Sequence, residues 1–387
     1  MRALILARVF PPRIGGIETY IYNLYSGLAD RLQVRVLAPR YPGWRQFDAQ
    51  SPLEIVRFRQ PPIIGEKHKV ILAPMFLAAC REVVAFRPQE IHCDQVDSAL
   101  VALCLKKVFR IPYRVFAYGM EITERRLTGL RRAAFRNAEA VLAITEHTKG
   151  LVMAEFGVPA ERIHVVYPAV DADRFTPCSR PQALAERLGL DGKKVILTTG
   201  RLPANERYKG QDTVIRALPA VLEQVPDVSY VLVGDGPDRR RLEQLAREQG
   251  VADAVIFAGE VPEQDLPDYY NLCDAFVMLS RDRRLKTGGS LGEGFGIVFL
   301  EAAACAKPVV GGRSGGIPEA VSDGVSGLLA DPTSVPAVAR TITQLLQDPD
   351  LAHRLGEQAR RRVLEHFTWQ KSCGDLFRTL DGKKEDG

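Results

Sequence analysis

The feature that most constrains the fold of this chain is an alternation of short apolar runs with amphipathic helical segments. In the first half, the runs that read as strands lie at residues 2–8, 33–39, 90–93, 113–119, 140–145 and 163–170. They are almost continuously apolar, which is typical of strands in a parallel sheet with helices on both faces. The pattern predicts an α/β fold with a doubly wound parallel sheet.

The alternation begins again after residues 171–194, which mix proline, glycine and charge. The second set of apolar runs lies at 194–201, 228–236, 254–261, 275–280, 308–312 and 326–330. Because 387 residues suffice for two domains, we expect two Rossmann-like domains facing across a cleft, at 1–178 and 190–365. Ligands should bind outside the carboxyl ends of the strands.

Composition and charge narrow the class of protein. Lys and Arg total 52 and Asp and Glu total 47, a bias too small to indicate nucleic-acid binding. The seven cysteines form no C-x-x-C pair, which favours a reduced, cytoplasmic compartment. No apolar run reaches the roughly 18 residues of a membrane-spanning helix, and the first ten residues read as a buried strand rather than a signal peptide. Membrane contact, if any, is expected to be peripheral, at the inner face.

The segment GEGFGIVFLEAAACAK, at 292–307, predicts a glycine-rich turn that leads into a helix. Glycines let the backbone approach a ligand, and the N–H groups of a first helical turn suit a phosphate. Glu301, about one turn into the helix, can accept hydrogen bonds from a ribose, and Glu293 can reach sugar hydroxyls. The alternative is a helix start capped by acidic residues, with Glu301 on a solvated face.

A second segment, GRLPANERYKGQD at 200–212, brings two cations to the same edge of the same domain. Arg201 and Lys209 follow an apolar strand, so both should lie near its carboxyl end. Together they can neutralise the charge that develops on a diphosphate leaving group, without a metal. The alternative for both is ordinary surface charge.

These segments resemble the retaining glycosyltransferases of family 4, which have the two-domain GT-B fold. The resemblance rests on the E-x7-E spacing of Glu293 and Glu301, on the two segments above, and on the blocks GGIPEAV, VDADRF and PPRIGGIETY. It covers residues 1 to about 380 and is more specific in the C-terminal half. Around 280–302 the chain is most similar to bacterial mannosyltransferases that act on phosphatidylinositol or related lipid and polysaccharide acceptors.

The resemblance implies a nucleotide-sugar-binding C-terminal domain. Arg201 and Lys209 would hold the donor diphosphate, Glu293 would contact donor sugar hydroxyls, and Glu301 would bind the ribose. Further donor contacts would come from the backbone near the base, at Val261, and near phosphate and sugar, at Phe295, Gly296 and Ile297.

The resemblance also implies an acceptor-binding N-terminal domain, on which a C-terminal helix at about 366–381 packs back. Gly15 and Gly16 would lie against the donor phosphate and the incoming acceptor. Many relatives carry His-Gly-x-Glu after the strand ending in YRVFA, and the histidine bonds the donor sugar. Here Tyr118 takes that place, with Gly119, Met120 and Glu121. A tyrosine can still donate one hydrogen bond, but a pKa of about 10 keeps it neutral at pH 7. The alternative for Tyr118 is a packing aromatic.

Other motifs carry weaker signals. Asp171 and Asp173 match a D-x-D metal pattern but lack a third ligand, and the six histidines have no zinc-ligand spacing, so we expect no metal. Gly234–Asp238, GDGPD, is interpreted as a tight turn rather than a dinucleotide site. Two basic segments, 65–77 and 124–136, are candidates for contact with an anionic membrane, the second through Arg125, Arg132 and Arg136 on one helical face.

The sequence thus predicts a metal-independent retaining glycosyltransferase that moves a hexose from a nucleoside diphosphate sugar to a hydroxyl of a lipid, lipid-linked glycan or polysaccharide. GDP-mannose is the preferred donor and a UDP-hexose the second choice, with no cofactor. Two alternatives stay open at this point. One is a GT-B UDP-sugar epimerase, which would need acids and a histidine that we cannot place, and the other is a nucleotide-sugar-binding protein without catalysis.

Overall fold

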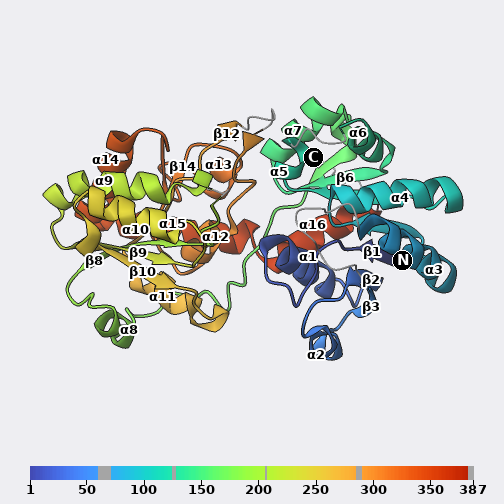
Figure 1. Ribbon diagram of the computed structural model, residues 1–387, viewed down its shortest axis with the longest axis horizontal. Coiled ribbons are helices and arrows are strands. Elements are labelled where there is room, and N and C mark those ends of the chain that lie inside the picture. The colour runs from blue at the N-terminus through green and yellow to red at the C-terminus, as the bar shows by residue number, and fades with distance from the viewer. Residues whose placement is uncertain (60–70, 124–127, 205–206, 285–289, 382–387) are drawn as a thin grey trace. The chain divides into compact units, whose positions relative to one another are not determined.

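The computed structural model describes residues 1–59, 71–123, 128–204, 207–284 and 290–381. It divides into two compact units, each built around its own parallel sheet (Figure 1). The first unit holds Met1–Pro168 together with the C-terminal segment that begins at Trp369, and the second holds Ala169–Lys286 and Ser290–Thr368.

The sheet of the first unit has seven parallel strands in the order β3-β2-β1-β4-β5-β6-β7. The strands are β1 (Arg2–Leu6), β2 (Gln33–Pro39), β3 (Glu54–Phe58), β4 (Glu90–Cys93), β5 (Tyr113–Ala117), β6 (Ala140–Ala143) and β7 (Ile163–Val165). The order reverses between β1 and β4, so the predicted doubly wound sheet is confirmed.

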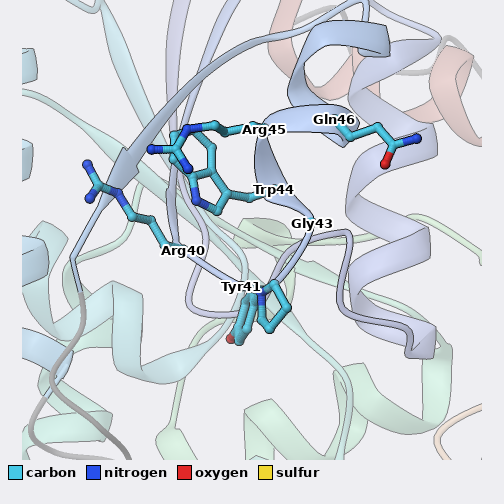
Figure 2. Close-up of a pocket in the computed structure, with 7 residues that line it drawn as sticks. Arg40, Tyr41, Gly43, Trp44, Arg45 and Gln46 are labelled. Atoms are coloured by element: carbon cyan, nitrogen blue, oxygen red, sulfur yellow. The ribbon is translucent and has the colours of Figure 1, made fainter.

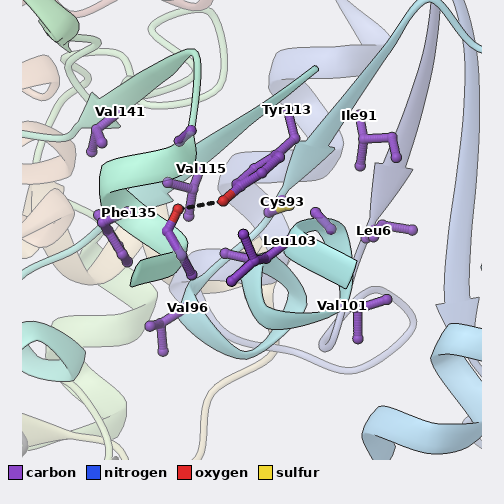
Figure 3. Close-up of a cluster of buried hydrophobic side chains, with 14 of the residues drawn as sticks. Leu6, Ile91, Cys93, Val96, Val101, Leu103, Tyr113, Val115, Phe135 and Val141 are labelled. Atoms are coloured by element: carbon purple, nitrogen blue, oxygen red, sulfur yellow. Dashed lines mark hydrogen bonds between the residues drawn. The ribbon is translucent and has the colours of Figure 1, made fainter. Parts of the chain in front are cut away.

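Helices cover both faces of this sheet. They are α1 (Gly16–Ser26), α2 (Trp44–Gln50), α3 (Leu72–Phe86), α4 (Val96–Phe109), α5 (Met120–Thr123), α6 (Thr128–Asn137), α7 (Glu146–Phe156) and α16 (Trp369–Asp381). One apolar cluster, which includes Val115, joins the sheet to α3, α4, α6 and α7 (Figure 3). The next side chain, Phe116, points to the other face, where its ring lies 5.8 Å from that of Tyr20 in α1.

The C-terminal helix α16 packs against α1 within the first unit. The Ser372 hydroxyl donates to the carbonyl of Tyr167 at 2.6 Å. A Cβ atom on Gly27, which follows α1, would lie only 2.6 Å from Sγ of Cys373, so a larger residue there would displace that side chain. The helix α15 (Pro349–His366) precedes α16 and is separate from it.

The sheet of the second unit has six parallel strands in the order β10-β9-β8-β11-β14-β15. They are β8 (Lys194–Thr199), β9 (Val228–Val233), β10 (Val255–Gly259), β11 (Ala275–Met278), β14 (Val309–Gly312) and β15 (Leu328–Ala330). The hairpin strands β12 (Arg283–Arg284) and β13 (Ser290–Leu291) form a separate two-stranded sheet.

The helices of the second unit also cover both faces of its sheet. They are α8 (Gln182–Arg187), α9 (Gln211–Gln224), α10 (Arg239–Glu248), α11 (Leu266–Leu272), α12 (Ile297–Ala304), α13 (Ile317–Ala320), α14 (Val335–Gln347) and α15. Val277 joins the cluster with α9, α10 and α14, whereas Phe276 packs edge-on against Phe299 of α12 at 5.5 Å. Among the helices described, none is both long and apolar enough to cross a bilayer.

Candidate active site

Three loops of the second unit meet at the carboxyl edge of its sheet. β8 and β11 are neighbours at the point where the strand order reverses, which is where α/β sheets bind ligands. A Cβ on Gly210, in the loop after β8, would lie 2.2 Å from the carbonyl oxygen of Leu279, which follows β11. A Cβ on Gly312, at the end of β14, would lie 2.3 Å from the carbonyl oxygen of Ser280. The loops after β8, β11 and β14 are therefore in backbone contact.

The two predicted cations lie on the first of these loops. Arg201 is exposed, and Lys209 ends the short 3-10 helix Arg207–Lys209. Nζ of Lys209 lies 3.9 Å from the position of a Cβ on Gly200, so its side chain reaches back to the residue before Arg201. Residues eight apart in sequence thus converge at the end of β8.

A partly buried ion pair holds this loop in place. The guanidinium of Arg281 forms a bidentate pair with Asp212 at 3.1 and 3.0 Å, and it also donates to the carbonyl of Arg207 at 3.0 Å. Although burial opposes it, the hydrogen bonds and charge of Arg281 and Arg216 hold the pKa of Asp212 below its usual value. Sequence reasoning missed both partners, because no motif links positions 212 and 281.

The start of α12 lies beside this loop region. Gly296 precedes the helix with φ +92°, and among the described residues no side chain caps the helix start. The preceding Phe295 is buried, with its ring 5.5 Å from that of Phe367. The aromatic anchor thus fixes the backbone of the Phe295–Ile297 turn, and the left-handed conformation at Gly296 directs it into the helix.

The two glutamates of the E-x7-E motif have different surroundings. The carbonyl of Glu293 accepts the N–H of Gly316 at 3.0 Å, and its carboxylate lies 3.5 Å from the Ser280 hydroxyl. Oε2 of Glu301 accepts a 2.5 Å hydrogen bond from Tyr270, whose oxygen lies 2.7 Å from the hydroxyl of Thr199. Burial raises the pKa of Glu301. Glu301 is therefore partly buried and hydrogen-bonded rather than fully solvated.

The weaker motifs of this unit are turns. Cβ atoms on Gly234 and Gly236 would lie 2.1 and 2.3 Å from the carbonyl oxygens of Gly200 and Leu202, so GDGPD is a tight turn against the loop after β8. Val261 follows β10 and is partly buried.

The D-x-D motif forms a local cap. Oδ1 of Asp171 accepts the N–H groups of Asp173 and Arg174, both at 3.1 Å. Across the described ranges, no group of three or more His, Cys, Asp or Glu side chains is arranged to hold a metal ion.

In the first unit, α1 begins at the predicted glycines. Gly15 precedes the helix in extended conformation, and Gly16 is its first residue. Glu18, in the first turn, is buried and pairs with Arg13 at 3.1 Å. A Cβ on Gly15 would lie 2.3 Å from Oε2 of Glu18, so this acid occupies the space beside the helix start.

Tyr118 follows β5, beside a buried acid that sequence reasoning missed. Its ring stacks on Phe116 at 6.4 Å, and its hydroxyl is buried without a hydrogen-bond partner among the described residues. Burial, with the charge of Asp94, raises the pKa of Tyr118 well above its usual value, so the phenol is neutral at pH 7. The unsatisfied hydroxyl distinguishes Tyr118 from an aromatic that only packs.

Asp94 follows β4 and is completely buried. Its carboxylate accepts the backbone N–H groups of Arg8 at 2.7 Å and Val9 at 3.2 Å, and the Ser98 hydroxyl at 2.6 Å. Burial raises the pKa of Asp94 to about 6, although these hydrogen bonds lower it. The sequence does contain a signal for this residue, because an aspartate directly after a central strand lies at the edge of the sheet where ligands bind.

Comparison with known proteins assigns the family. The model of Glycosyltransferase Family 4 matches residues 14–174, and that of Glycosyl transferases group 1 matches residues 182–362. The GDP-mannose-dependent alpha-(1-6)-phosphatidylinositol monomannoside mannosyltransferase of Mycolicibacterium smegmatis is 33% identical over an alignment of 392 positions, which covers 99% of each protein. The chain belongs to glycosyltransferase family 4.

Other relatives of this family 4 glycosyltransferase agree. The alpha-D-kanosaminyltransferase of Streptomyces kanamyceticus is 32% identical over 69% of this chain and 70% of its own length. Anabaena Alr3699/HepE, solved in complex with UDP and glucose, is 23% identical with a TM-score of 0.81 over 99% of this chain and 100% of its own. Sucrose-phosphate synthase from Thermosynechococcus elongatus, at 22% identity, also has a TM-score of 0.81, over 98% of this chain and 99% of its own. The predicted GT-B fold and retaining glycosyltransferase activity are confirmed.

The basic segments that were candidates for membrane contact lie partly outside the described residues, including 65–70 and Arg125. Of the rest of the glycosyltransferase's basic face, Arg132 donates to the carbonyl of Glu155 at 2.9 Å and Arg136 to that of Phe156 at 2.7 Å. Both carbonyls belong to the last turn of α7, so these arginines stabilise a helix end.

Proposed function

We propose that this family 4 glycosyltransferase transfers mannose from GDP-mannose to a hydroxyl of a phosphatidylinositol-type glycolipid. The proposal is supported by relatives that match nearly the whole chain. The Mycobacterium tuberculosis protein, 32% identical over 98% of both chains, carries the same name as the M. smegmatis one. The Corynebacterium glutamicum relative, at 29% over 95% of both, is a GDP-mannose-dependent monoacylated alpha-(1-6)-phosphatidylinositol monomannoside mannosyltransferase.

The donor site is assigned to the second unit. Arg201 and Lys209 neutralise the diphosphate, and the backbone N–H groups of Phe295, Gly296 and Ile297 bind phosphate and sugar oxygens. Glu293 accepts hydrogen bonds from sugar hydroxyls and Glu301 from the ribose, while the backbone at Val261 receives the base. The single observation that carries this assignment is the return of the Lys209 side chain to the Gly200–Arg201 turn.

The first unit is assigned to the sugar and the acceptor. Gly15 and Gly16 form the backbone surface that the acceptor and the donor phosphate approach. The buried hydroxyl of Tyr118, which has no partner among the described residues, donates one hydrogen bond to the donor sugar. This hydroxyl takes over the donor role of the family histidine but stays uncharged.

The mechanism is substitution on one face of the sugar. The bond from the anomeric carbon to the β-phosphate oxygen breaks, and the acceptor oxygen bonds to that carbon from the same side. The acceptor proton passes to the departing phosphate oxygen, whose charge Arg201 and Lys209 stabilise. Asp94 is completely buried and is held by its hydrogen bonds, so it is unsuited to form a covalent intermediate.

The test is loss of turnover in the double variant Arg201→Ala/Lys209→Ala, which should fall at least about 100-fold because charge stabilisation in the transition state is removed. The control Arg187→Ala/Arg240→Ala removes two exposed cations of the same unit and should keep wild-type turnover. Near-normal turnover in the first variant would refute the site.

Thermal shifts identify the donor, because a ligand at 100 times its Kd adds about 2.7 kcal/mol of stability. GDP-mannose should shift the midpoint more than UDP-glucose or ADP-glucose.

A further inference from the structure

Arginines gather at one end of the first sheet, where three neighbouring strands finish. β3, β2 and β1 are adjacent in the sheet, and the N–H of Arg40, just after β2, bonds the carbonyl of Phe58, the last residue of β3. Each strand end is followed by exposed arginines: Arg59 after β3, Arg40 and Arg45 after β2, and Arg13 after β1. We call these four residues the arginine edge.

A tryptophan organises the centre of the arginine edge. The guanidinium carbons of Arg40 and Arg45 lie 5.3 and 4.7 Å from the ring centroid of Trp44 (Figure 2). The guanidinium groups of Arg40 and Arg45 repel each other, and cation–π contact with the same ring holds them near one another. Residues Arg40–Gln46 also line a hollow of about 540 Å³. The result is a surface hollow with two cations arranged around an aromatic ring.

An exposed apolar side chain lies in a neighbouring loop. Ile14 is 86% exposed, in the loop after β1. That loop approaches the residue before Trp44, because a Cβ on Gly43 would lie 3.9 Å from Cγ of Pro12. Tryptophan with an exposed aliphatic residue and flanking arginines is the composition of surfaces that lie at a membrane interface.

Within the part of the chain that the structure describes, two acids near the arginine edge are already paired with arginines. Asp48 of α2 pairs with the buried Arg57 at 2.7 Å, and Glu18 pairs with Arg13 at 3.1 Å. The remaining neighbours in α2, such as Gln46 and Gln50, are uncharged. The arginine edge therefore presents net positive charge, which complements a negatively charged surface.

We propose that the arginine edge, with Trp44 and Ile14, docks the first unit on an anionic phospholipid bilayer. Arginines would contact lipid phosphates while Trp44 and Ile14 enter the headgroup region. This proposal goes beyond the transfer reaction, because it assigns the surface that contacts the membrane carrying the acceptor. It rests on the proposed function only in that a lipid acceptor gives the enzyme a reason to bind a membrane.

The test is binding to vesicles of phosphatidylcholine with 30% phosphatidylinositol, measured by co-sedimentation. Each cation near an anionic leaflet adds about fivefold in affinity, so Arg40→Gln/Arg45→Gln should bind about 25-fold more weakly. Binding should also weaken with added salt. The matched control Arg2→Gln/Lys107→Gln removes the same charge from exposed positions elsewhere on the first unit. Equal losses in the two double variants would overturn the proposal.

Tryptophan fluorescence locates the contact. The chain has two tryptophans, so Trp369→Phe leaves Trp44 as the single reporter. Its emission should shift to the blue with anionic vesicles but not with soluble inositol phosphate. An equal shift with the soluble compound, or none with vesicles, would contradict membrane docking. Donor binding, measured by thermal shift, should be unchanged in Arg40→Gln/Arg45→Gln, so a failure of docking is distinct from a failure of the proposed reaction.

Discussion

The two sheets each have a buried acid near their carboxyl edge, and the two acids are held in opposite ways. In the first unit, Asp94 accepts only uncharged donors, and burial raises its pKa to about 6. In the second, Asp212 is buried too, but Arg281 and Arg216 pair with it and its pKa is lowered. The first edge thus holds an acid that can take up a proton, and the second holds a fixed ion pair.

The helix starts at these edges differ in the same sense. Both α1 and α12 begin after a glycine with no side-chain cap from the described residues. α1 carries Glu18 in its first turn, whereas α12 has no acid there. The start of α12 suits a phosphate, and the start of α1 is already occupied by a carboxylate. The comparison teaches that one architecture can place an acid in the first turn of one helix and leave the equivalent turn of the other without one.

The largest expected effect separates the two buried acids by pH. A carboxyl group whose pKa is raised in the folded state contributes stability that is present below its unfolded pKa. This stability is lost as the pH rises through the folded pKa, which is about 6 for Asp94. From pH 4 to 7, wild-type stability should therefore fall by about 2 kcal/mol relative to Asp94→Asn. Denaturation followed by tryptophan fluorescence reports this unit, which contains both tryptophans.

The control for that experiment is Asp212→Asn. Because the pKa of Asp212 is lowered, its stabilisation is present above the unfolded value of about 4 and is lost only as pH falls below it. Asp212→Asn should therefore show no relative change between pH 5 and 7. A flat difference for Asp94→Asn over the same range would contradict the contrast between the units.

Gly296→Ala tests the helix start of the second unit. The left-handed φ of +92° and a Cβ 2.7 Å from the Phe299 ring both oppose a side chain there. We expect a loss of about 2 kcal/mol in unfolding free energy and about 100-fold in turnover, because the turn proposed to bind phosphate must shift. Gly16→Ala in α1 meets no atom within 4 Å and should leave thermal stability unchanged. Calorimetry and steady-state kinetics measure both; a stable, active Gly296→Ala enzyme would sink the assignment.

Glu301→Gln and Tyr270→Phe test the ribose contact. Removing the carboxylate should weaken donor binding about tenfold, and removing the tyrosine hydroxyl about threefold, since Tyr270 orients Glu301 through their 2.5 Å bond. Burial raises the pKa of Glu301, so wild-type affinity should begin to fall on acidification at a higher pH than for an exposed glutamate. Titration calorimetry with a 2′,3′-dideoxy donor supplies the control, because neither substitution should weaken its binding.

The smallest effect concerns Glu18. If the donor phosphate approaches α1, Glu18→Gln should tighten binding of GDP about threefold by removing a negative charge from the helix start. Glu146→Gln, which changes a first-turn acid of α7, should leave the Kd unchanged. An unchanged Kd in Glu18→Gln would mean that the phosphate stays with the second unit.

Most strands could be predicted because their residues are continuously apolar; β2 begins and ends as expected, at Gln33 and Pro39. β3 was missed because its sequence, EIVRF, carries charges. Arg57 in that strand is tolerated only because Asp48 and two backbone carbonyls surround it.

The candidate site could be predicted where it follows local motifs. Residues 200–212 and 292–307 each predict a turn and a helix start within a few positions. Since both segments follow strands of one parallel sheet, Arg201, Lys209 and Gly296 could be expected at the same edge of that sheet. The contacts of Tyr270 with Glu301 and of Arg281 with Asp212 join residues 31 and 69 positions apart. No local pattern encodes such pairs.

The sequence by itself therefore determined the two α/β units and the residue types at their strand ends, because apolar periodicity and glycine-rich turns act over a few residues. Only the tertiary structure decided which acids are charged, which helix start is open to an anion and where the arginines gather. Those properties depend on burial and on partners that the fold brings from distant parts of the chain.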